Sequence, residues 1–502
     1  MDYAKAYTSC QYGMDTKKII VQAHLANGVP NFNIVGLGDK AVSESKERIR
    51  AAFSSLNLGL PAKRITINLA PANLQKEGTH YDLSIALAIL AAGHIINHTV
   101  LNKYIVHGEL SLDGRINPSS GVLPSSIFAN RLNKGFICSK FNIDEAIISG
   151  HKNIIATNNL LEIIRFFKGE IEISPNLEKP KSYLKKYKDF SDVKGMKLVK
   201  RAIEIAASGR HNLLMIGSPG TGKSMMAERI PSILPELTAM EILENSIIKT
   251  LSNMPLKKVI DISIPFRAPH HSASLVALTG GGKKITPGEI SLSHNGVLFL
   301  DELPEFKSDT LESLRQPMEN KFISIARADR TVKFPANFQF ISAMNPCRCG
   351  YYQIPGKRCS KAPLCTVEYL KKISGPLMER IDMIINIPHT DLTLFQNNSS
   401  PEENSITIRE RIKKVRKIQQ DNLSSFAIKT NSEISLDMFE NNIQISISGK
   451  ELIQKIQNKY DFSIRTILKI LRVSKTIADM ENSNEINDNN ILEALNYKLN
   501  SD

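Results

Sequence analysis

The chain has 502 residues, of which 42% are hydrophobic and 23% are charged, as in an ordinary globular protein of two to four domains. Its formal net charge of +14 is compatible with a polyanionic partner and equally with a merely lysine-rich surface. No apolar run reaches the roughly 18 residues of a membrane span, and residues 1–7 show no secretion signal. We therefore expect a cytoplasmic protein without a membrane partner.

Residues 1–170 are predicted to form a first α/β unit. Residues 64–69 alternate as in a half-buried strand, whereas residues 39–53 and 81–92 have helical patterns. The next residues, 171–188, contain two prolines, many lysines and few apolar side chains, which predicts a linker.

Residues 217–224 fit the phosphate-binding template G-x-x-x-x-G-K-[ST] at every fixed position. An apolar run at 213–216 precedes them and predicts a buried strand, and residues 225–229 read as the start of a helix. Unpaired backbone N–H groups at such a helix start bind anions, and glycines leave room for a phosphate. We expect ATP to be bound here, with Lys223 on the β- and γ-phosphates. The candidate ATP-binding residues are Gly217, Ser218, Pro219, Gly220, Thr221, Gly222, Lys223, Ser224 and Met225.

Two carboxylates follow a second apolar run, residues 297–300. Ligands of parallel sheets bind at the carboxyl ends of the strands, so Asp301 is predicted to hold Mg²⁺ together with Ser224. Glu302 is the candidate general base for the attacking water. A third apolar run, 338–344, ends at Asn345, whose amide could orient that water.

Residues 189–390 alternate between strand and helix patterns, which predicts a parallel sheet covered on both faces. Residues 391–502 begin with a polar stretch and continue with helical patterns, as expected of a small α-helical lid.

Four cysteines gather near the end of the sheet-forming segment, with the spacing C-x-C-x₉-C-x₅-C. Clustered cysteines in a reducing compartment suggest a structural zinc ion, although this is not a standard zinc spacing. The alternative is a loop whose thiols bind no metal. The candidate ligands are Cys347, Cys349, Cys359 and Cys365.

Five segments resemble signatures of the ComM/YifB family, which belongs to the magnesium-chelatase-like branch of the AAA+ ATPases. The resemblance spans nearly the whole chain and is carried by residues 189–195, 266–271, 287–306, 314–319 and 374–382. It implies a ring, expected to be a hexamer, of P-loop AAA+ ATPase domains with C-terminal helical lids. In this family the position of Arg380 is similar to the arginine finger, that of Arg465 to sensor 2 and that of Asn345 to sensor 1.

The first unit resembles the Lon-protease-like N-terminal domain of the same family. Lon peptidases use a Ser–Lys pair, but here His80 stands at the serine position and Leu123 at the lysine position. We therefore expect a binding or assembly role and no proteolysis.

Two basic loops are candidates for gripping DNA without reading its sequence. Lys283 and Lys284 end a glycine-rich loop, and Arg327 and Arg330 lie at the turn of a predicted hairpin at 322–333. Both loops could instead only buttress the nucleotide site or the subunit interface. The resemblance implies a DNA helicase that promotes branch migration of single-stranded or branched DNA during natural transformation. The alternatives are a chelatase-like motor that remodels a protein partner and an assembly module without translocation.

Overall fold

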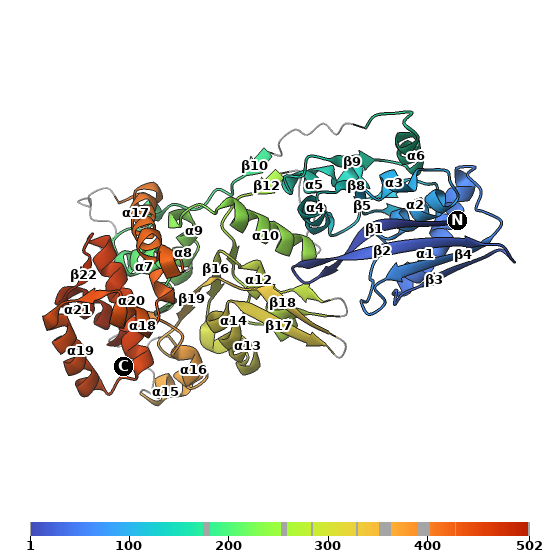
Figure 1. The fold of residues 1–502 in the computed structure, drawn as a ribbon. Coiled ribbons are helices and arrows are strands. Elements are labelled where there is room, and N and C mark those ends of the chain that lie inside the picture. The colour runs from blue at the N-terminus through green and yellow to red at the C-terminus, as the bar shows by residue number, and fades with distance from the viewer. Residues whose placement is uncertain are drawn as a thin grey trace. The chain divides into compact units, whose positions relative to one another are not determined.

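The computed structural model describes residues 2–173, 181–252, 259–282, 285–327, 330–350, 363–388, 402–426 and 428–499. The chain divides into two compact units (Figure 1). Unit 1 comprises Met1–Leu184, Ala239–Ile262 and Ala328–Phe334, and unit 2 comprises the remainder of the chain. No helix within the described ranges is long and apolar enough to cross a bilayer.

Unit 1 is built on a seven-stranded mixed sheet in the order β3-β4-β2-β1-β5-β8-β9. Side chains of β2, of β4 and of the first half of β1 alternate between buried and more exposed positions, which is the pattern of a sheet with one face on the core. The predicted strand at 64–69 is confirmed as β4. The strands are β1 (Tyr3–Tyr12), β2 (Asp15–Ala26), β3 (Asn31–Val35), β4 (Arg64–Ala70), β5 (Tyr104–Val106), β8 (Gly135–Ser139) and β9 (Ile154–Thr157).

The helices of unit 1 pack on both faces of this sheet. All eleven residues of α2 are buried, as expected of a helix that is apolar around its whole circumference. The predicted helix at 39–53 is confirmed as α1, where the Asp39 side chain accepts a hydrogen bond from the Val42 N–H. The helices are α1 (Lys40–Ser55), α2 (Asp82–Ala92), α3 (His98–Leu101), α4 (Val122–Arg131), α5 (Ile143–Ile148), α6 (Leu160–Lys168) and α10 (Ala239–Leu251).

Part of the predicted linker is ordered as a strand. β10 (Lys181–Tyr183) pairs in parallel with β12 (Val259–Asp261), so the segment gains backbone hydrogen bonds despite its few apolar residues. The pairing partner lies far along the chain, and no local pattern indicates it. The remaining short strands of unit 1 are β6 (Glu109–Leu110) and β7 (Ile116–Asn117).

Unit 2 contains the predicted parallel sheet, with the strand order β13-β16-β19-β11-β20. All four strand pairs are parallel, and every residue of β11, β16 and β19 is buried. Such continuous apolar strands require cover on both faces. The strands are β11 (Leu213–Gly217), β13 (Phe266–Arg267), β16 (Val297–Leu300), β19 (Gln339–Met344) and β20 (Met383–Ile387).

Short helices and strands connect the sheet of unit 2. The helix predicted from residue 225 is present but begins two residues earlier, as α8. These elements are α7 (Lys197–Gly209), α8 (Lys223–Ala227), α9 (Ile230–Ile233), α11 (Leu275–Thr279), α12 (Glu289–Leu292), α13 (Ser308–Glu312), α14 (Arg315–Asn320), α15 (Leu364–Leu370), α16 (Gly375–Met378), β14 (Gly280–Gly281), β15 (Thr286–Pro287), β17 (Phe322–Arg327) and β18 (Arg330–Pro335), the last lying mostly in unit 1.

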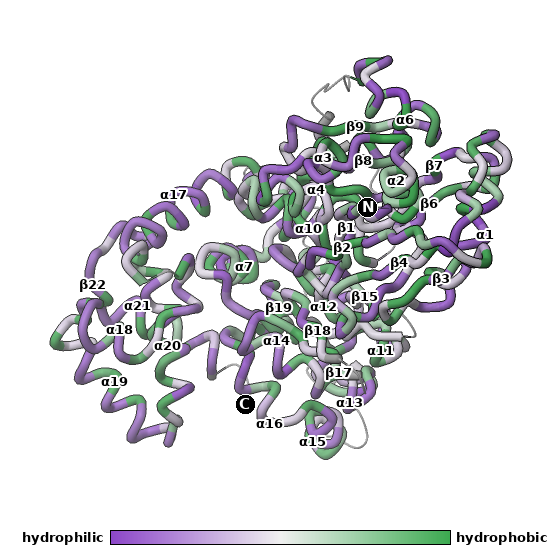
Figure 2. Tube along the Cα trace, turned by 45° about the vertical axis from the view of Figure 1, so that its right-hand side comes forward, coloured by the Kyte–Doolittle hydropathy of each residue, from purple (hydrophilic) through white to green (hydrophobic). Residues whose placement is uncertain are grey.

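The C-terminal helices share one apolar core with the sheet and α7. In α17 the residues Ile408, Ile412 and Val415 are buried at spacings of four and three, and the tube in Figure 2 alternates between hydrophilic and hydrophobic colours along this helix. The elements are α17 (Ser405–Leu423), α18 (Leu436–Asn441), α19 (Ile447–Tyr460), α20 (Ile464–Met480), α21 (Asp488–Leu499), β21 (Gln444–Ile445) and β22 (Glu485–Ile486).

Candidate active site

The segment 217–224 forms a backbone cradle between β11 and α8. Gly220 and Gly222 have φ angles of +80° and +82°, a region in which side chains are strained. A Cβ atom on Gly217 would lie 2.8 Å from Thr221 Oγ1. Any residue other than glycine would therefore clash here and distort the turn. The cradle therefore has the conformation that a triphosphate requires, with N–H groups at the start of a helix.

Lys223 is held at the centre of the cradle. Its Nζ donates hydrogen bonds to the carbonyl oxygens of Gly217 at 2.6 Å and Ser218 at 2.9 Å, and to Asn345 Oδ1 at 3.2 Å. Burial lowers the pKa of Lys223, while the carboxylates of Asp301 and Glu302 act in the opposite direction. The structure thus brings together Lys223, at the start of α8, and Asn345, which directly follows β19.

The candidate magnesium ligands are in direct contact. The Ser224 hydroxyl donates a hydrogen bond to Asp301 Oδ2, and both side chains line a cavity of about 390 Å³. A hydroxyl and a carboxylate oxygen are hard ligands of the kind that Mg²⁺ binds. These residues fit Mg²⁺ bound with ATP, and the ion would neutralise charge on the phosphates.

Glu302 lies beside Asp301 in the same cavity. Its φ of +51° places it in the left-handed region, and its N–H donates to Asp301 Oδ1 at 2.9 Å. Its carboxylate Oε2 is 3.5 Å from His271 Nδ1. This histidine was not singled out as a site residue from the sequence. The feature of the sequence that could have indicated His271 is the His270–His271 pair at the end of the segment 266–271.

The cysteine segment starts directly beside the cradle. A Cβ on Gly350 would lie 2.5 Å from Pro219 Cδ, and the sulfur atoms of Cys347 and Cys349 are 3.2 Å apart. Cys359 lies outside the described residues. Among the residues that are described, no group of three or more His, Cys, Asp or Glu side chains is arranged to hold a metal ion. Zinc therefore stays a prediction, and the structure does not support it.

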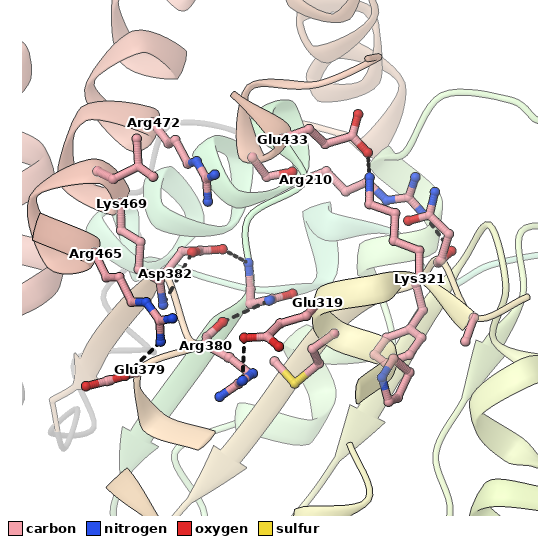
Figure 3. Close-up of a pocket in the computed structure, with 18 residues that line it drawn as sticks. Arg210, Glu319, Lys321, Glu379, Arg380, Asp382, Glu433, Arg465, Lys469 and Arg472 are labelled. Atoms are coloured by element: carbon pink, nitrogen blue, oxygen red, sulfur yellow. Dashed lines mark hydrogen bonds and ion pairs between the residues drawn. The ribbon is translucent and has the colours of Figure 1, made fainter. Parts of the chain in front are cut away.

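A second cavity of about 430 Å³ lies at the opposite edge of the same sheet (Figure 3). In the parallel pair β11–β20, Leu213 is opposite Met383 and Gly217 is opposite Ile387. The cradle follows Gly217 at the carboxyl end, whereas Arg380 precedes Met383 at the amino end. The Leu213–Met383 pair and the Gly217–Ile387 pair are four residues apart, which corresponds to about 13 Å along the strands. Arg380 is therefore remote from the cradle of its own chain.

Arg380 and Arg465 line this second cavity together. The Arg380 guanidinium pairs with Glu319 and donates to the Pro376 carbonyl at 2.5 Å, and Arg465 Nη1 lies 3.9 Å from Glu379 Oε2. Figure 3 shows both guanidinium groups directed toward these carboxylates. The Nε atom of Arg380 is buried and has no hydrogen-bond partner among the described residues.

Cations outnumber carboxylates around the second cavity. Burial is the largest cause that lowers the pKa of Lys321 and of Lys469 to about 8 each, and neighbouring arginines add to the effect on Lys321. An anion in the cavity would relieve this repulsion. The cations are Arg210, Lys321, Arg380, Arg465, Lys469 and Arg472, and the carboxylates are Glu319, Glu379, Asp382 and Glu433.

The two predicted DNA loops are only partly described. Lys283 and Lys284 lie outside the described residues. Arg327 and Arg330 lie at facing ends of β17 and β18, and their side chains are not among those described. The four contacts stay predictions.

In unit 1, the two positions compared with the Lon pair lie in the core or near it. Leu123 is fully buried, and the His80 ring stacks on His107 with centroids 4.5 Å apart. His80 Nε2 lies 3.1 Å from the Ser9 carbonyl oxygen. The prediction that this unit does not cleave peptides is not tested by these contacts.

Models of known protein families match three successive segments of the chain. Models described as "Subunit ChlI of Mg-chelatase", "Magnesium chelatase, subunit ChlI" and "Magnesium chelatase, subunit ChlI C-terminal" match residues 21–142, 189–394 and 402–498. A magnesium-chelatase 67 kDa subunit of Chlorobaculum tepidum is 25% identical over 31% of this chain and 23% of that protein.

Two relatives match from end to end. Competence protein ComM of Haemophilus influenzae is 38% identical over 99% of this chain and 98% of its own. The protein YifB of Escherichia coli is 37% identical over 99% and 97%, respectively. The cradle, the carboxylates Asp301 and Glu302 directly after β16, and these full-length matches together show that the chain belongs to the ComM/YifB family of magnesium-chelatase-like AAA+ ATPases.

Proposed function

We propose that this protein is an ATP-driven ring motor that moves DNA in the cytoplasm. In this proposal it promotes branch migration, as a helicase, when incoming DNA recombines during natural transformation. The observation that supports a ring-shaped assembly is the position of Arg380 and Arg465. Both lie at the amino ends of the sheet strands, opposite the carboxyl ends that hold the cradle. Because both guanidinium groups line a cavity away from the cradle of their own chain, we infer that a complete hydrolytic site takes them from a neighbouring copy.

The described contacts support the following chemistry at such a shared site. Lys223 would hold the phosphates, and Ser224 and Asp301 would hold Mg²⁺, which would neutralise charge on the phosphates. Glu302 accepts the proton of the attacking water, and Asn345 orients that water beside Lys223. A neighbour's Arg380 stabilises the charge that spreads over the γ-phosphoryl oxygens during transfer, a role suited to a planar guanidinium.

Three observations favour DNA as the substrate. The relative that is 38% identical is named a competence protein. The net charge of +14 favours a polyanion. The basic loops at 283–284 and 327–330 provide Lys and Arg, which contact phosphates without reading bases. We infer a hexamer that tracks single-stranded or branched DNA independently of its sequence.

A second candidate is a motor that remodels a protein partner. It is favoured by the family models, all three of which are described as parts of a magnesium chelatase subunit. In that case a protein, and not DNA, would raise the rate of ATP hydrolysis.

The test is the steady-state ATPase rate of the purified full-length protein with and without DNA. We expect single-stranded DNA of unrelated sequences to raise the rate several-fold, and the increase to fall steeply with salt. Lys223→Ala should abolish hydrolysis with and without DNA, which assigns the activity to this cradle. A rate that no DNA changes would contradict the DNA motor, and hydrolysis retained in Lys223→Ala would remove the cradle from the mechanism.

A further inference from the structure

Part of one face of the unit 1 sheet is covered by none of the described helices of the unit. Helices α1 and α2 pack on one face, where Ala6, Val21 and Ile67 enter the core. On the other face α4 and α5 pack over β5, β8 and β9, with Tyr7 of β1 at the margin of that cluster, and α4 also covers the second half of β1 and the start of β2, where Ser9 donates a hydrogen bond to Ser125. Strands β3, β4 and β2 and the first half of β1 lie side by side (Figure 1), and their outward residues stay intermediate or exposed.

The pairing register decides which residues share this open face. Lys5 is opposite Gln22, which is opposite Asn68 on β4. Tyr3 is opposite His24, and Arg64 is opposite Asn31 on β3. Because side chains alternate between faces at every residue, all of these point away from the core. We call the outward residues of β3 and β4, those of β2 from Lys18 onward and those of β1 up to Tyr7 the open face.

The open face is positively charged and has no balancing carboxylate. Its outward residues on β1–β4, all of which lie in described parts of the chain, include Lys5, Lys18 and Arg64 but no Asp or Glu. Among the described residues, none of these three cations forms an ion pair, whereas Lys63, next in the chain to Arg64, pairs with Asp2. Such uncompensated charge attracts anions.

Two lysines, one of them Lys18, lie against an aromatic ring of β1. Lys18 Nζ lies 4.0 Å from the centroid of the Tyr7 ring, and Lys134 Nζ lies 4.6 Å from it. Burial lowers the pKa of Lys134, and the neighbouring charges of Lys18 and Lys5 lower it further. Tyr3, at the other end of the face, is 45% exposed, so a planar group could stack on it.

We propose that the open face of unit 1 binds single-stranded nucleic acid. Lys5, Lys18 and Arg64, on three neighbouring strands, would contact the phosphates. Tyr3 would stack on a base, and the amides of Gln22 and Asn68, joined at 2.8 Å, would meet base edges. An open sheet that combines cations, exposed rings and amides recognises unstacked bases, which a duplex does not offer.

This surface deepens the proposed action on DNA but is separate from the ATP cradle. Binding to it requires no hydrolysis, so the two proposals can fail independently. If DNA stimulates the ATPase of a variant that lacks the face as strongly as it stimulates the wild type, the open face is not the substrate site. If the face binds DNA but DNA leaves hydrolysis unchanged, the motor proposal fails and this one stands.

The decisive variant is Lys5→Gln/Lys18→Gln/Arg64→Gln in the full-length protein. Each phosphate contact with a single strand contributes about 0.7 to the slope of log K against log salt. Losing three contacts should lower that slope by about 2 and weaken binding about 50-fold at 0.15 M salt. The measurement is fluorescence anisotropy of a labelled oligo-dT without nucleotide.

Matched controls separate the face from general charge and from misfolding. Lys17→Gln removes a lysine that neighbours Lys18 but lies on the opposite face, also over a tyrosine ring, at 4.8 Å from Tyr12. We expect it to change the affinity less than twofold. The triple variant should keep the wild-type melting temperature and DNA-free ATPase rate, since its three side chains lie outside the core.

A further variant separates base stacking from charge. Tyr3→Ala should weaken oligo-dT binding fivefold or more while leaving heparin binding unchanged, since heparin offers charge but no bases. Equal loss for heparin, or equal affinity for a duplex of the same length, would overturn the assignment to single strands. Unchanged affinity and salt slope in the triple variant would overturn the proposal as a whole.

Discussion

The opposite-edge placement of Arg380 predicts that hydrolysis requires two copies of the chain. Glu302→Gln removes the candidate base but leaves the arginines, and Arg380→Ala removes the finger but leaves the cradle. If Arg380 acts as an arginine finger, its loss should lower the hydrolysis rate about 1,000-fold, and loss of the base should lower it at least about 100-fold. Each variant alone is therefore expected to be almost inactive.

Mixing the two variants should restore activity, because the defects are at different sheet edges. In a ring assembled at random from equal amounts, half of the cradles are intact, and half of those face a neighbour with an intact Arg380. About one quarter of the interfaces are then complete, whatever the ring size, for a head-to-tail arrangement. We expect about a quarter of the wild-type rate.

The assay is the steady-state ATPase rate at fixed total protein, with the proteins mixed before ATP and Mg²⁺ are added. Arg380→Ala mixed equally with wild type is the control and should give about half of the wild-type rate, because half of the neighbours supply a finger. A mixture of the two variants that is no more active than its components would refute the reasoning. It would show that Arg380 acts on the cradle of its own chain or only supports the fold.

Three further predictions concern the same unit. Glu302→Gln should abolish hydrolysis but keep ATP affinity within about threefold, since the cradle is untouched; equilibrium binding of a fluorescent ATP analogue measures this. The lowered pKa of Lys469, about 8 against an ordinary 10.5, means that its charged form disfavours folding below pH 8. The free energy of unfolding of the wild type should therefore rise relative to Lys469→Met between pH 8 and 10.5, by up to about 3 kcal/mol, in urea titrations. If the cysteine cluster binds zinc, elemental analysis should find one ion per chain, and fewer after Cys347→Ser.

Each of these has an outcome that contradicts it. A large loss of ATP affinity in Glu302→Gln would show that the carboxylate also shapes the cradle. Parallel pH curves for wild type and Lys469→Met would mean that burial of Lys469 does not disfavour its charge. Protein purified without chelators that contains no zinc would end the metal interpretation of the cysteines.

The amino-acid sequence by itself determined the nucleotide cradle and the elements beside it. Residues 213–229 encode a strand, a glycine turn and a helix start within one short segment, and the turn glycines adopt φ angles that other residues resist. The apolar run before Asp301 likewise encodes a buried strand with its carboxylates at the end. Conformation that depends on near neighbours in the chain can be predicted from a local pattern.

Only the tertiary structure decided which distant residues meet. Arg380 and Arg465 come from separate segments, and the strand order β13-β16-β19-β11-β20 places them together and away from the cradle. The approach of His271 to Glu302 and the open face of unit 1 depend in the same way on strand pairing and register. Pairing is set by the packing of the whole core and not by local preference, so no short pattern in the sequence reports it.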